Sequence, residues 1–133
     1  MLRSVLVKNH MTKNPLTLSP DMEILKATQL LINRDVSGAP VLDTHGRLVG
    51  VLTERDCMRV AMQADYYGEP GGLVKEFMSE NPEWVGPEQS ILMLADLFIN
   101  GRFHRYPVVD NGRLVGIISR RDVMRAMGKY YPA

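Results

Sequence analysis

Two pairs of oxygen-bearing side chains, each a hydroxyl and a carboxylate three residues apart, occur in this chain of 133 residues. Thr53 precedes Asp56 in "GVLTERD", and Ser119 precedes Asp122 in "GIISRRD". At the start of a helix, such a hydroxyl accepts a hydrogen bond from a first-turn amide, and the acid reaches back to the capping residue, although Asp is shorter than the usual Glu or Gln. Helix capping is therefore one interpretation of both heptads.

The same geometry can serve a ligand. A helix N-terminus presents unpaired amides and a partial positive charge, which together favour an anion. A carboxylate placed there makes sense if the ligand carries both phosphate and vicinal hydroxyls. The carboxylate would accept hydrogen bonds from both ribose hydroxyls, while the Ser or Thr hydroxyl and the amides would face phosphate. The residues alone leave both interpretations open.

An internal repeat supplies the elements that position these pairs. Seven residues recur at an offset of 67: Met11, Pro15, Pro20, Ile24, Leu25, Ile32 and Pro40 match Met78, Pro82, Pro87, Ile91, Leu92, Ile99 and Pro107. After "DTHG" shortens to "DNG", the match resumes at an offset of 66, and 12 of 18 compared positions are identical. We predict repeats over 1–66 and 67–133, with a linker at about 63–72, "QADYYGEPGG".

Each repeat is predicted to run strand, helix, strand, strand, helix. "PLTLSPD" is a short extended segment in which Ser19 can cap a helix that begins at Pro20. Apolar residues then follow at helical spacing: Ile24, Ala27, Leu31 and Ile32, and again Ile91, Leu94, Phe98 and Ile99. "APVLD" and "RLVGVL" are strand-like, as are "YPVVD" and "RLVGII", which a hairpin-forming "NG" separates. The second helices are expected from Thr53 and Ser119.

Composition bounds the classes of protein that the chain can represent. The net charge of +1 gives no case for a nucleic-acid partner, and no stretch is apolar for long enough to span a membrane. The single cysteine, Cys57, suits a reducing cytoplasm. The histidines and Cys57 show no metal-ligand spacing, and no catalytic signature is present, so we expect neither a metal site nor an enzyme.

The strand "PVLD" or "PVVD", a glycine-containing turn, "RLVGVL" or "RLVGII", and then Ser/Thr-x-x-Asp, all in tandem, resemble a stand-alone pair of CBS domains, a Bateman module. The resemblance covers about Val5 to Gly128. It implies an α/β (α+β) fold of two β-α-β-β-α repeats, packed through their sheets with pseudo-two-fold symmetry. It also implies two clefts that hold AMP, ADP or ATP, or sometimes S-adenosylmethionine, and a homodimer that the helices of Met58 and Met124 would join.

The resemblance carries site residues over to this chain. Asp56 and Asp122 fall on the ribose-binding position, and "VSGAP" and "FHRYP" on the segment that lines the base and phosphate. In the first strand a Thr-Val-like pair matches Thr17-Leu18, and Trp84-Val85 departs from it. The predicted nucleotide-binding residues are Thr17, Ser37, Ala39, Pro40, Thr53, Arg55, Asp56, Val85, His104, Arg105, Tyr106, Pro107, Ser119, Arg120, Arg121 and Asp122.

Charge makes the two predicted sites unequal. Residues 34–59 contain four arginines and four acids, whereas residues 101–125 contain six arginines (102, 105, 113, 120, 121 and 125) and two acids. Guanidinium groups suit phosphate oxygens, although a solvated face is the simpler explanation of a charge cluster. "FHRYPVVD" is also similar to the His-Arg-x-Pro pattern of the γ subunit of AMP-activated kinase, which makes His104 and Arg105 phosphate candidates. We expect the Asp122 half to supply most of the phosphate binding.

The function that follows from the resemblance is an energy-sensing regulatory module. It would need no cofactor, bind adenosine nucleotide as its regulatory ligand, and shift the affinity of an unidentified partner protein. Two alternatives stay open. One is a ligand-free interaction or dimerisation module in which the motif residues only cap helices, and the other is a sensor of S-adenosylmethionine.

Overall fold

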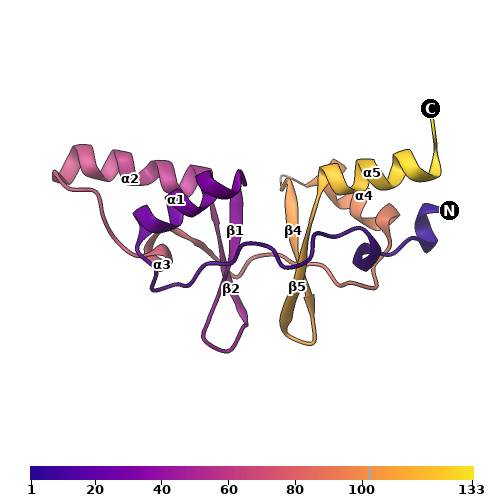
Figure 1. The fold of residues 1–133 in the computed structure, drawn as a ribbon, viewed down its shortest axis with the longest axis horizontal. Coiled ribbons are helices and arrows are strands. Elements are labelled where there is room, and N and C mark those ends of the chain that lie inside the picture. Colours follow the sequence, from indigo (N-terminus) through magenta and orange to yellow (C-terminus); the bar gives the residue numbers. More distant parts are fainter. Residues whose placement is uncertain (102) are drawn as a thin grey trace. The chain divides into compact units, whose positions relative to one another are not determined.

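The chain forms two compact units (Figure 1). The computed structural model describes residues 1–101 and 103–133, so Arg102 of the arginine count lies outside the described residues. The central unit comprises Leu16–Pro82, and the composite unit comprises Met1–Pro15 together with Glu83–Ala133. The compact units and the predicted repeats, 1–66 and 67–133, are divided differently, because the first part of each predicted repeat, residues 1–15 or 67–82, packs in the unit formed by the rest of the other repeat. We keep the repeat boundaries as a proposal that rests on the 67-residue offset.

The central unit is built from helices on an antiparallel sheet. Its elements are α1 (Ile24–Arg34), β1 (Gly38–Leu42), β2 (Leu48–Thr53), α2 (Glu54–Tyr67), α3 (Val74–Phe77) and β3 (Ser79–Glu80). The strand order is β1-β2-β3. Leu18 adds a parallel bridge to Val41 of β1, so the predicted first strand is a single bridged residue in an extended segment.

The composite unit repeats this plan. Its elements are the 3-10 helices η1 (Leu2–Ser4) and η2 (Val7–Asn9), then α4 (Ile91–Asn100), β4 (Arg105–Asp110), β5 (Arg113–Ser119) and α5 (Arg120–Tyr130). Strands β4 and β5 pair antiparallel. Val85 bridges Val108 in parallel, and Thr12 bridges Ile117 antiparallel. The mixture of helices with small sheets confirms the predicted α+β class.

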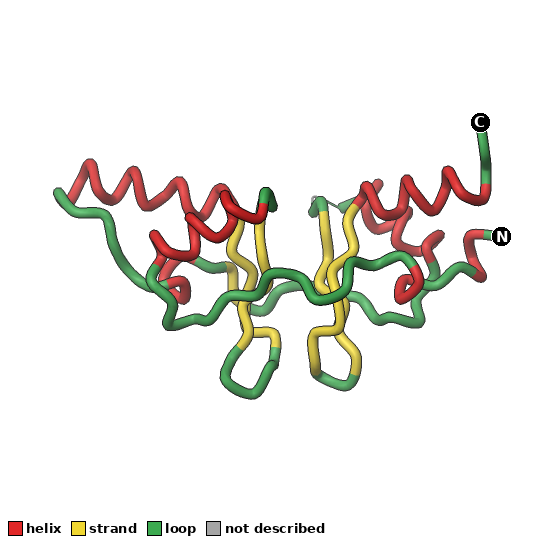
Figure 2. The backbone as a smooth tube through the Cα atoms, in the orientation of Figure 1, coloured by secondary structure: helices red, strands yellow, loops and turns green. Residues whose placement is uncertain are grey.

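The hairpins set the register on which both sites depend (Figure 2). Asn111 and Gly112 have φ angles of 51° and 79°, as a two-residue turn with a left-handed backbone requires, so the predicted "NG" turn is confirmed. Ser119 consequently pairs with Arg105. In the central unit Thr53 pairs with Gly38. Each helix-capping residue therefore lies beside the start of the preceding strand.

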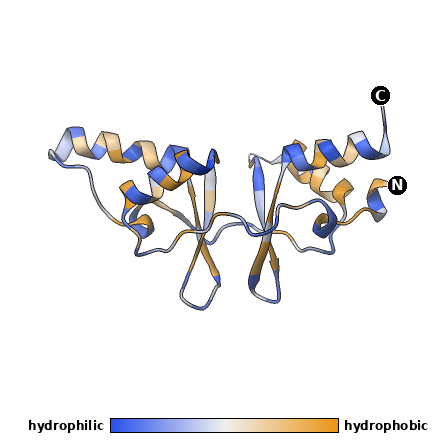
Figure 3. Cartoon of the chain, viewed as in Figure 1, coloured by the Kyte–Doolittle hydropathy of each residue, from blue (hydrophilic) through white to orange (hydrophobic). Residues whose placement is uncertain are grey.

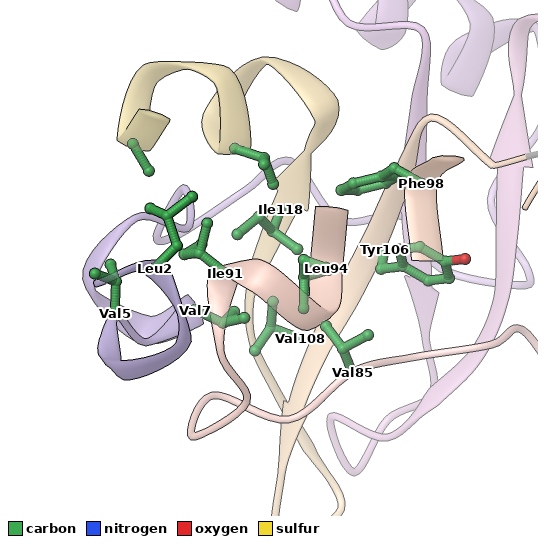
Figure 4. Close-up of a cluster of buried hydrophobic side chains, with 12 residues drawn as sticks. Leu2, Val5, Val7, Val85, Ile91, Leu94, Phe98, Tyr106, Val108 and Ile118 are labelled. Carbon is green, nitrogen blue, oxygen red and sulfur yellow. The ribbon is translucent and has the colours of Figure 1, made fainter. Parts of the chain in front are cut away.

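The hydrophobic cluster of the composite unit lies between its helices and one face of its hairpin (Figure 4). Most of the predicted helical stripe is buried there, as is the corresponding stripe of α1 in the central unit. Ile32 and Ile99, which were predicted in the stripe, are exposed instead. Adjacent helical residues differ by about 100° around the axis. Because Leu31 and Phe98 take the buried direction, the residues that follow them point to solvent.

The first helix begins later than predicted. Helix α1 starts at Ile24, and Ser19 does not cap it. The Ser19 hydroxyl accepts only from the amide of Asp21, at 3.3 Å, within a local turn. The Ile24 amide, which would close a helical turn onto the Pro20 carbonyl, donates instead to the Gly72 carbonyl at 2.9 Å, and the Pro20 carbonyl accepts from the Lys75 amide at 3.0 Å.

The end of α2 also corrects the prediction. The helix continues through residues 63–67, which were predicted as the start of the linker, and ends at Gly68, whose φ is 91°. The linker is therefore non-helical only from Gly68 onward. Over the described part of the chain, every helix is too short or too polar to cross a bilayer.

Candidate functional site

Capping boxes begin α2 and α5, as one interpretation of the heptads predicted. The backbone amide and the hydroxyl of Ser119 both donate to Oδ2 of Asp122, at 2.8 and 3.0 Å, and the Asp122 amide donates to the Ser119 hydroxyl at 3.2 Å. Thr53 and Asp56 make the same three bonds, at 2.9, 3.0 and 3.4 Å. Both carboxylates are buried. The shorter Asp is thus long enough to complete the box.

Each carboxylate also has an arginine partner that the sequence analysis missed. Nη1 of Arg59 donates to Oδ1 of Asp56 at 2.7 Å, and Nη1 of Arg125 donates to Oδ1 of Asp122 at 3.2 Å. The repeated Asp-x-x-Arg spacing was the available signal, because residues three apart are neighbours on a helix. The Arg59 and Arg125 side chains are 58% and 67% exposed. They can therefore move aside without disturbing the core.

These contacts leave the carboxylates with limited but real capacity for a ligand. An ionised carboxylate has about four acceptor positions. On Asp122, Oδ2 uses two of them for Ser119 and Oδ1 uses one for Arg125. One position on Oδ1 stays available, and a second becomes available if the exposed guanidinium swings away. A vicinal diol can thus bind at Oδ1 while the capping box stays intact.

The start of β4 meets the first turn of α5. The Arg120 amide donates to the His104 carbonyl at 3.1 Å, and Arg105 pairs with Ser119 across the hairpin. In the central unit, the Glu54 amide donates likewise to the Ser37 carbonyl at 2.9 Å. Two amides in the first turn of each helix therefore bond within the protein. A phosphate would be met mainly by side chains, which revises the expectation that the amides face it.

The predicted site residues fall into three groups by exposure. Exposed are Thr17, Arg55, His104, Arg120 and Arg121. Half-buried are Ser37, Thr53, Arg105 and Ser119. Buried are Ala39, Pro40, Asp56, Val85, Tyr106, Pro107 and Asp122. In Figure 3 the first turn of α5, which carries the two exposed arginines, is accordingly coloured hydrophilic.

Three of the buried residues hold the site in place from the core. The side chains of Val85 and Tyr106 belong to the hydrophobic cluster of the composite unit, and Ala39 belongs to that of the central unit. The backbone of Val85 is engaged as well, since its amide donates to Pro107 at 3.0 Å and its carbonyl accepts from Val109 at 2.9 Å. These residues position the exposed groups.

The heptad glycines, Gly50 and Gly116, have no side chain, so another segment of the same unit can pack closely against each of them. A Cβ on Gly116 would lie 2.7 Å from Sδ of Met11 and 2.8 Å from the Thr12 carbonyl oxygen. A Cβ on Gly50 would meet Met78 and the segment after it in the same way. Sequence analysis found both methionines in the repeat but not their contact with the glycines, because the two partners are far apart in the chain.

Cys57 lies beside Asp56 on α2 and packs against the core. Burial raises the pKa of its thiol, and a hydrogen bond with Thr28 partly offsets that rise. The neutral thiol is the poorer nucleophile and metal ligand. Packing against the core, rather than reactivity, is the role that this environment favours. Among the residues that the structure describes, no three His, Cys, Asp or Glu side chains gather as a metal site would require.

Comparison with protein families matches both halves of the chain. The family model described as "CBS domain" matches residues 7–63 and 74–129. The chain belongs to the CBS domain family. The resemblance inferred from the heptads is thereby confirmed, as is the tandem CBS pair.

Several solved structures and curated sequences are similar to this CBS pair. The CBS domain-containing protein YhcV of Bacillus subtilis is 33% identical over 118 residues, which cover 88% of this chain and 81% of YhcV. CBSX2 of Arabidopsis thaliana, in a crystal structure with AMP, superposes with a TM-score of 0.84 at 28% identity, covering 95% of this chain and 98% of CBSX2. The CBS domain pair of protein MJ0100, in complex with 5′-methylthioadenosine and S-adenosyl-L-methionine, superposes with a TM-score of 0.81 at 28% identity, covering 95% and 98%.

The chain spans a smaller share of other relatives. It covers from 23% to 65% of the length of four further curated proteins, among them the inosine-5′-monophosphate dehydrogenase of Aquifex aeolicus. The CBS pair thus occurs both in proteins little longer than itself and as a minor part of longer ones.

Proposed function

We propose that this CBS pair is a regulatory module that binds adenosine nucleotide, AMP, ADP or ATP, at the N-terminal end of α5. The observation that carries the proposal is the buried Asp122 carboxylate, which keeps acceptor capacity on Oδ1 beside exposed arginines. The crystal structures of CBSX2 with AMP and of the MJ0100 pair with adenosyl compounds support this class of ligand.

Ribose recognition is assigned to the carboxylate of Asp122. The capping box fixes its position, because Ser119 holds Oδ2 from two donors. The ribose hydroxyls donate to Oδ1 of Asp122. Because the Arg125 side chain is exposed, it can swing away and free the acceptor position that it occupies on Oδ1. Hydrogen bonds to a charged acceptor are worth about 1.5–3 kcal/mol each. Asp56 offers the same geometry in the central unit.

Phosphate recognition is assigned to the arginines of the composite unit. Arg120 and Arg121 are exposed on the first turn of α5, and Arg105 is half-buried opposite Ser119. In the central unit the matching positions hold Glu54, Arg55 and Gly38, so one positive charge is balanced by one negative charge. Phosphate binding is therefore concentrated in the composite unit.

Regulation follows from linkage. A nucleotide that binds one arrangement of the module more tightly shifts the population toward it, and with it the affinity for a partner protein. We propose further that the module acts as a homodimer in the cytoplasm and is not itself catalytic. Met58 and Met124, at matched positions on α2 and α5, are each 64% exposed. Their exposure supports a contact with a second subunit.

S-adenosylmethionine is a second candidate ligand, which the MJ0100 structure specifically favours. Its ribose would use Asp122 in the same way, but it has no phosphate to engage Arg121. A ligand-free module, in which Ser119 and Asp122 only cap α5, is the remaining alternative.

Calorimetric titration with AMP, ADP, ATP, S-adenosylmethionine and NAD separates these possibilities. We expect heat of binding from an adenosine nucleotide. Arg121→Ala should weaken ATP binding roughly 10- to 150-fold with little effect on adenosine, because about 1.5–3 kcal/mol of charged hydrogen bonding is lost. Arg113→Ala is the matched control, since it removes the same charge at the opposite end of β5. If none of the five compounds produced heat of binding, helix capping would be the only interpretation of the motif residues that remains.

A further inference from the structure

Trp84 is the chain's single tryptophan and stands where the first repeat has Thr17, 67 positions earlier. Its side chain is 57% exposed, and it is absent from the hydrophobic cluster of the composite unit. Packing among the described residues therefore does not account for it. An indole left this exposed keeps a large apolar surface in water, which is unfavourable unless something covers it.

The backbone beside Trp84 fixes the side of the sheet that it faces. The amide of Val85 donates to Pro107 and its carbonyl accepts from Val109, so the segment lies along β4 as a parallel neighbour. The Val85 side chain points into the core with Val108 (Figure 4). Successive side chains on an extended segment point to opposite faces. Trp84 is thereby directed to the face opposite the core.

Arg105 and Ser119 lie on that same face. Tyr106 and Ile118, a cross-strand pair, point into the core, so their neighbours Arg105 and Ser119 point the other way. The segment of Trp84, then β4, then β5 follow one another across the sheet. Trp84 lies level with Pro107 and Ile117, two residues along the strands from Ser119. Two steps between strands of about 4.8 Å each, with that offset of about 7 Å, place the Trp84 segment about 12 Å from Ser119. A nucleotide whose ribose lies on Asp122 can extend its base over that distance.

We propose that Trp84 is the stacking platform for the adenine base of a nucleotide bound in the composite unit. The inference rests on the proposed function and deepens it by naming the residue that selects base-bearing ligands. Aromatic side chains stack on bases and contribute about 1–3 kcal/mol per base. The central unit, with Thr17 in place of the indole, lacks this contact. Stacking of the base and charge pairing of the phosphate therefore both favour nucleotide binding in the composite unit over the central unit.

The fluorescence emission of Trp84 can test the proposed stacking contact directly. With selective excitation of the indole, AMP should quench Trp84 emission in a saturable manner, and ribose 5-phosphate, which has no base, should not. By calorimetry, Trp84→Ala should weaken AMP binding roughly 5- to 150-fold, the range that about 1–3 kcal/mol corresponds to. Trp84→Phe keeps a ring and should retain most of the affinity, whereas Trp84→Thr, which copies the first repeat, should behave like the alanine variant.

The outcomes distinguish this inference from the proposed function. Calorimetric binding of AMP with unchanged Trp84 emission, and an affinity within twofold in Trp84→Ala, would overturn the stacking role while leaving nucleotide binding in place. Absence of heat with every adenosine compound would remove the proposed function and the stacking role together. Because Trp84 is outside the hydrophobic cluster, its variants should keep the wild-type thermal transition, which is the control for folding.

Discussion

The Asp122 carboxylate caps α5 and, in the proposed function, binds ribose, and Asp122→Asn should separate the two roles. The amide oxygen of Asn can still accept from the Ser119 amide and hydroxyl, so the capping bonds survive. The variant loses the ion pair with Arg125, worth about 0.2–1 kcal/mol because the guanidinium is largely exposed. It also loses a negative charge at the helix N-terminus, worth about 0.3–1 kcal/mol. The free energy of unfolding should fall by about 0.5–2 kcal/mol.

Nucleotide affinity should fall further than stability. In Asp122→Asn the amide oxygen is occupied by Ser119, so the ribose hydroxyls meet an NH₂ donor where Oδ1 had accepted. Losing one charged hydrogen bond of about 1.5–3 kcal/mol weakens binding roughly 10- to 150-fold. Asp56→Asn is the matched control. It removes the same capping charge and a comparable ion pair with Arg59, so its stability loss should be similar.

Urea unfolding and calorimetric titration with AMP measure the two quantities on the same samples. An Asp122→Asn variant with unchanged unfolding free energy would refute the assigned charge contributions. Normal AMP affinity in that variant would refute the ribose assignment. Equal affinity losses in Asp122→Asn and Asp56→Asn would contradict the unequal units.

Three further predictions test the packing and the assembly. Gly116→Ala should lower the free energy of unfolding, measured in urea, by about 1–3 kcal/mol, because the new methyl overlaps Met11. The control Gly128→Ala, in open space on α5, should raise it by about 0.5–1 kcal/mol. Equal effects of the two substitutions would contradict the close approach of Met11 to Gly116. Since burial raises the pKa of Cys57, the folded chain should react with a thiol reagent more slowly than the urea-unfolded chain at neutral pH. Raising the pH through the range in which thiols titrate should lower the free energy of unfolding, because the Cys57 thiol of the unfolded chain loses its proton at a lower pH than that of the folded chain. Met58→Glu combined with Met124→Glu should convert a dimer to a monomer in sedimentation velocity, and an unchanged mass would remove these helices from the interface.

Local patterns were sufficient to predict most of the fold. The Ser-x-x-Asp and Thr-x-x-Asp heptads predicted capping boxes at Ser119 and Thr53, and "NG" predicted the turn at Asn111. These features depend on hydrogen bonds between residues two to four apart, so a short stretch of sequence contains both partners. The start of α1 was wrong for the complementary reason. The Ile24 amide that would close the earlier turn bonds to the Gly72 carbonyl, a contact that no local pattern around Ser19 can reveal.

The sequence by itself determined the tandem repeat, the family, the positions of Asp56 and Asp122, and the unequal arginine content of the two halves. Only the tertiary structure decided which residues surround those carboxylates. It placed Val85 in the core and thereby turned Trp84 to the face of Arg105. It also completed the composite unit with Met1–Pro15, which explains Gly116. The physical reason is that side-chain alternation and close packing act between segments that meet only after the chain has folded.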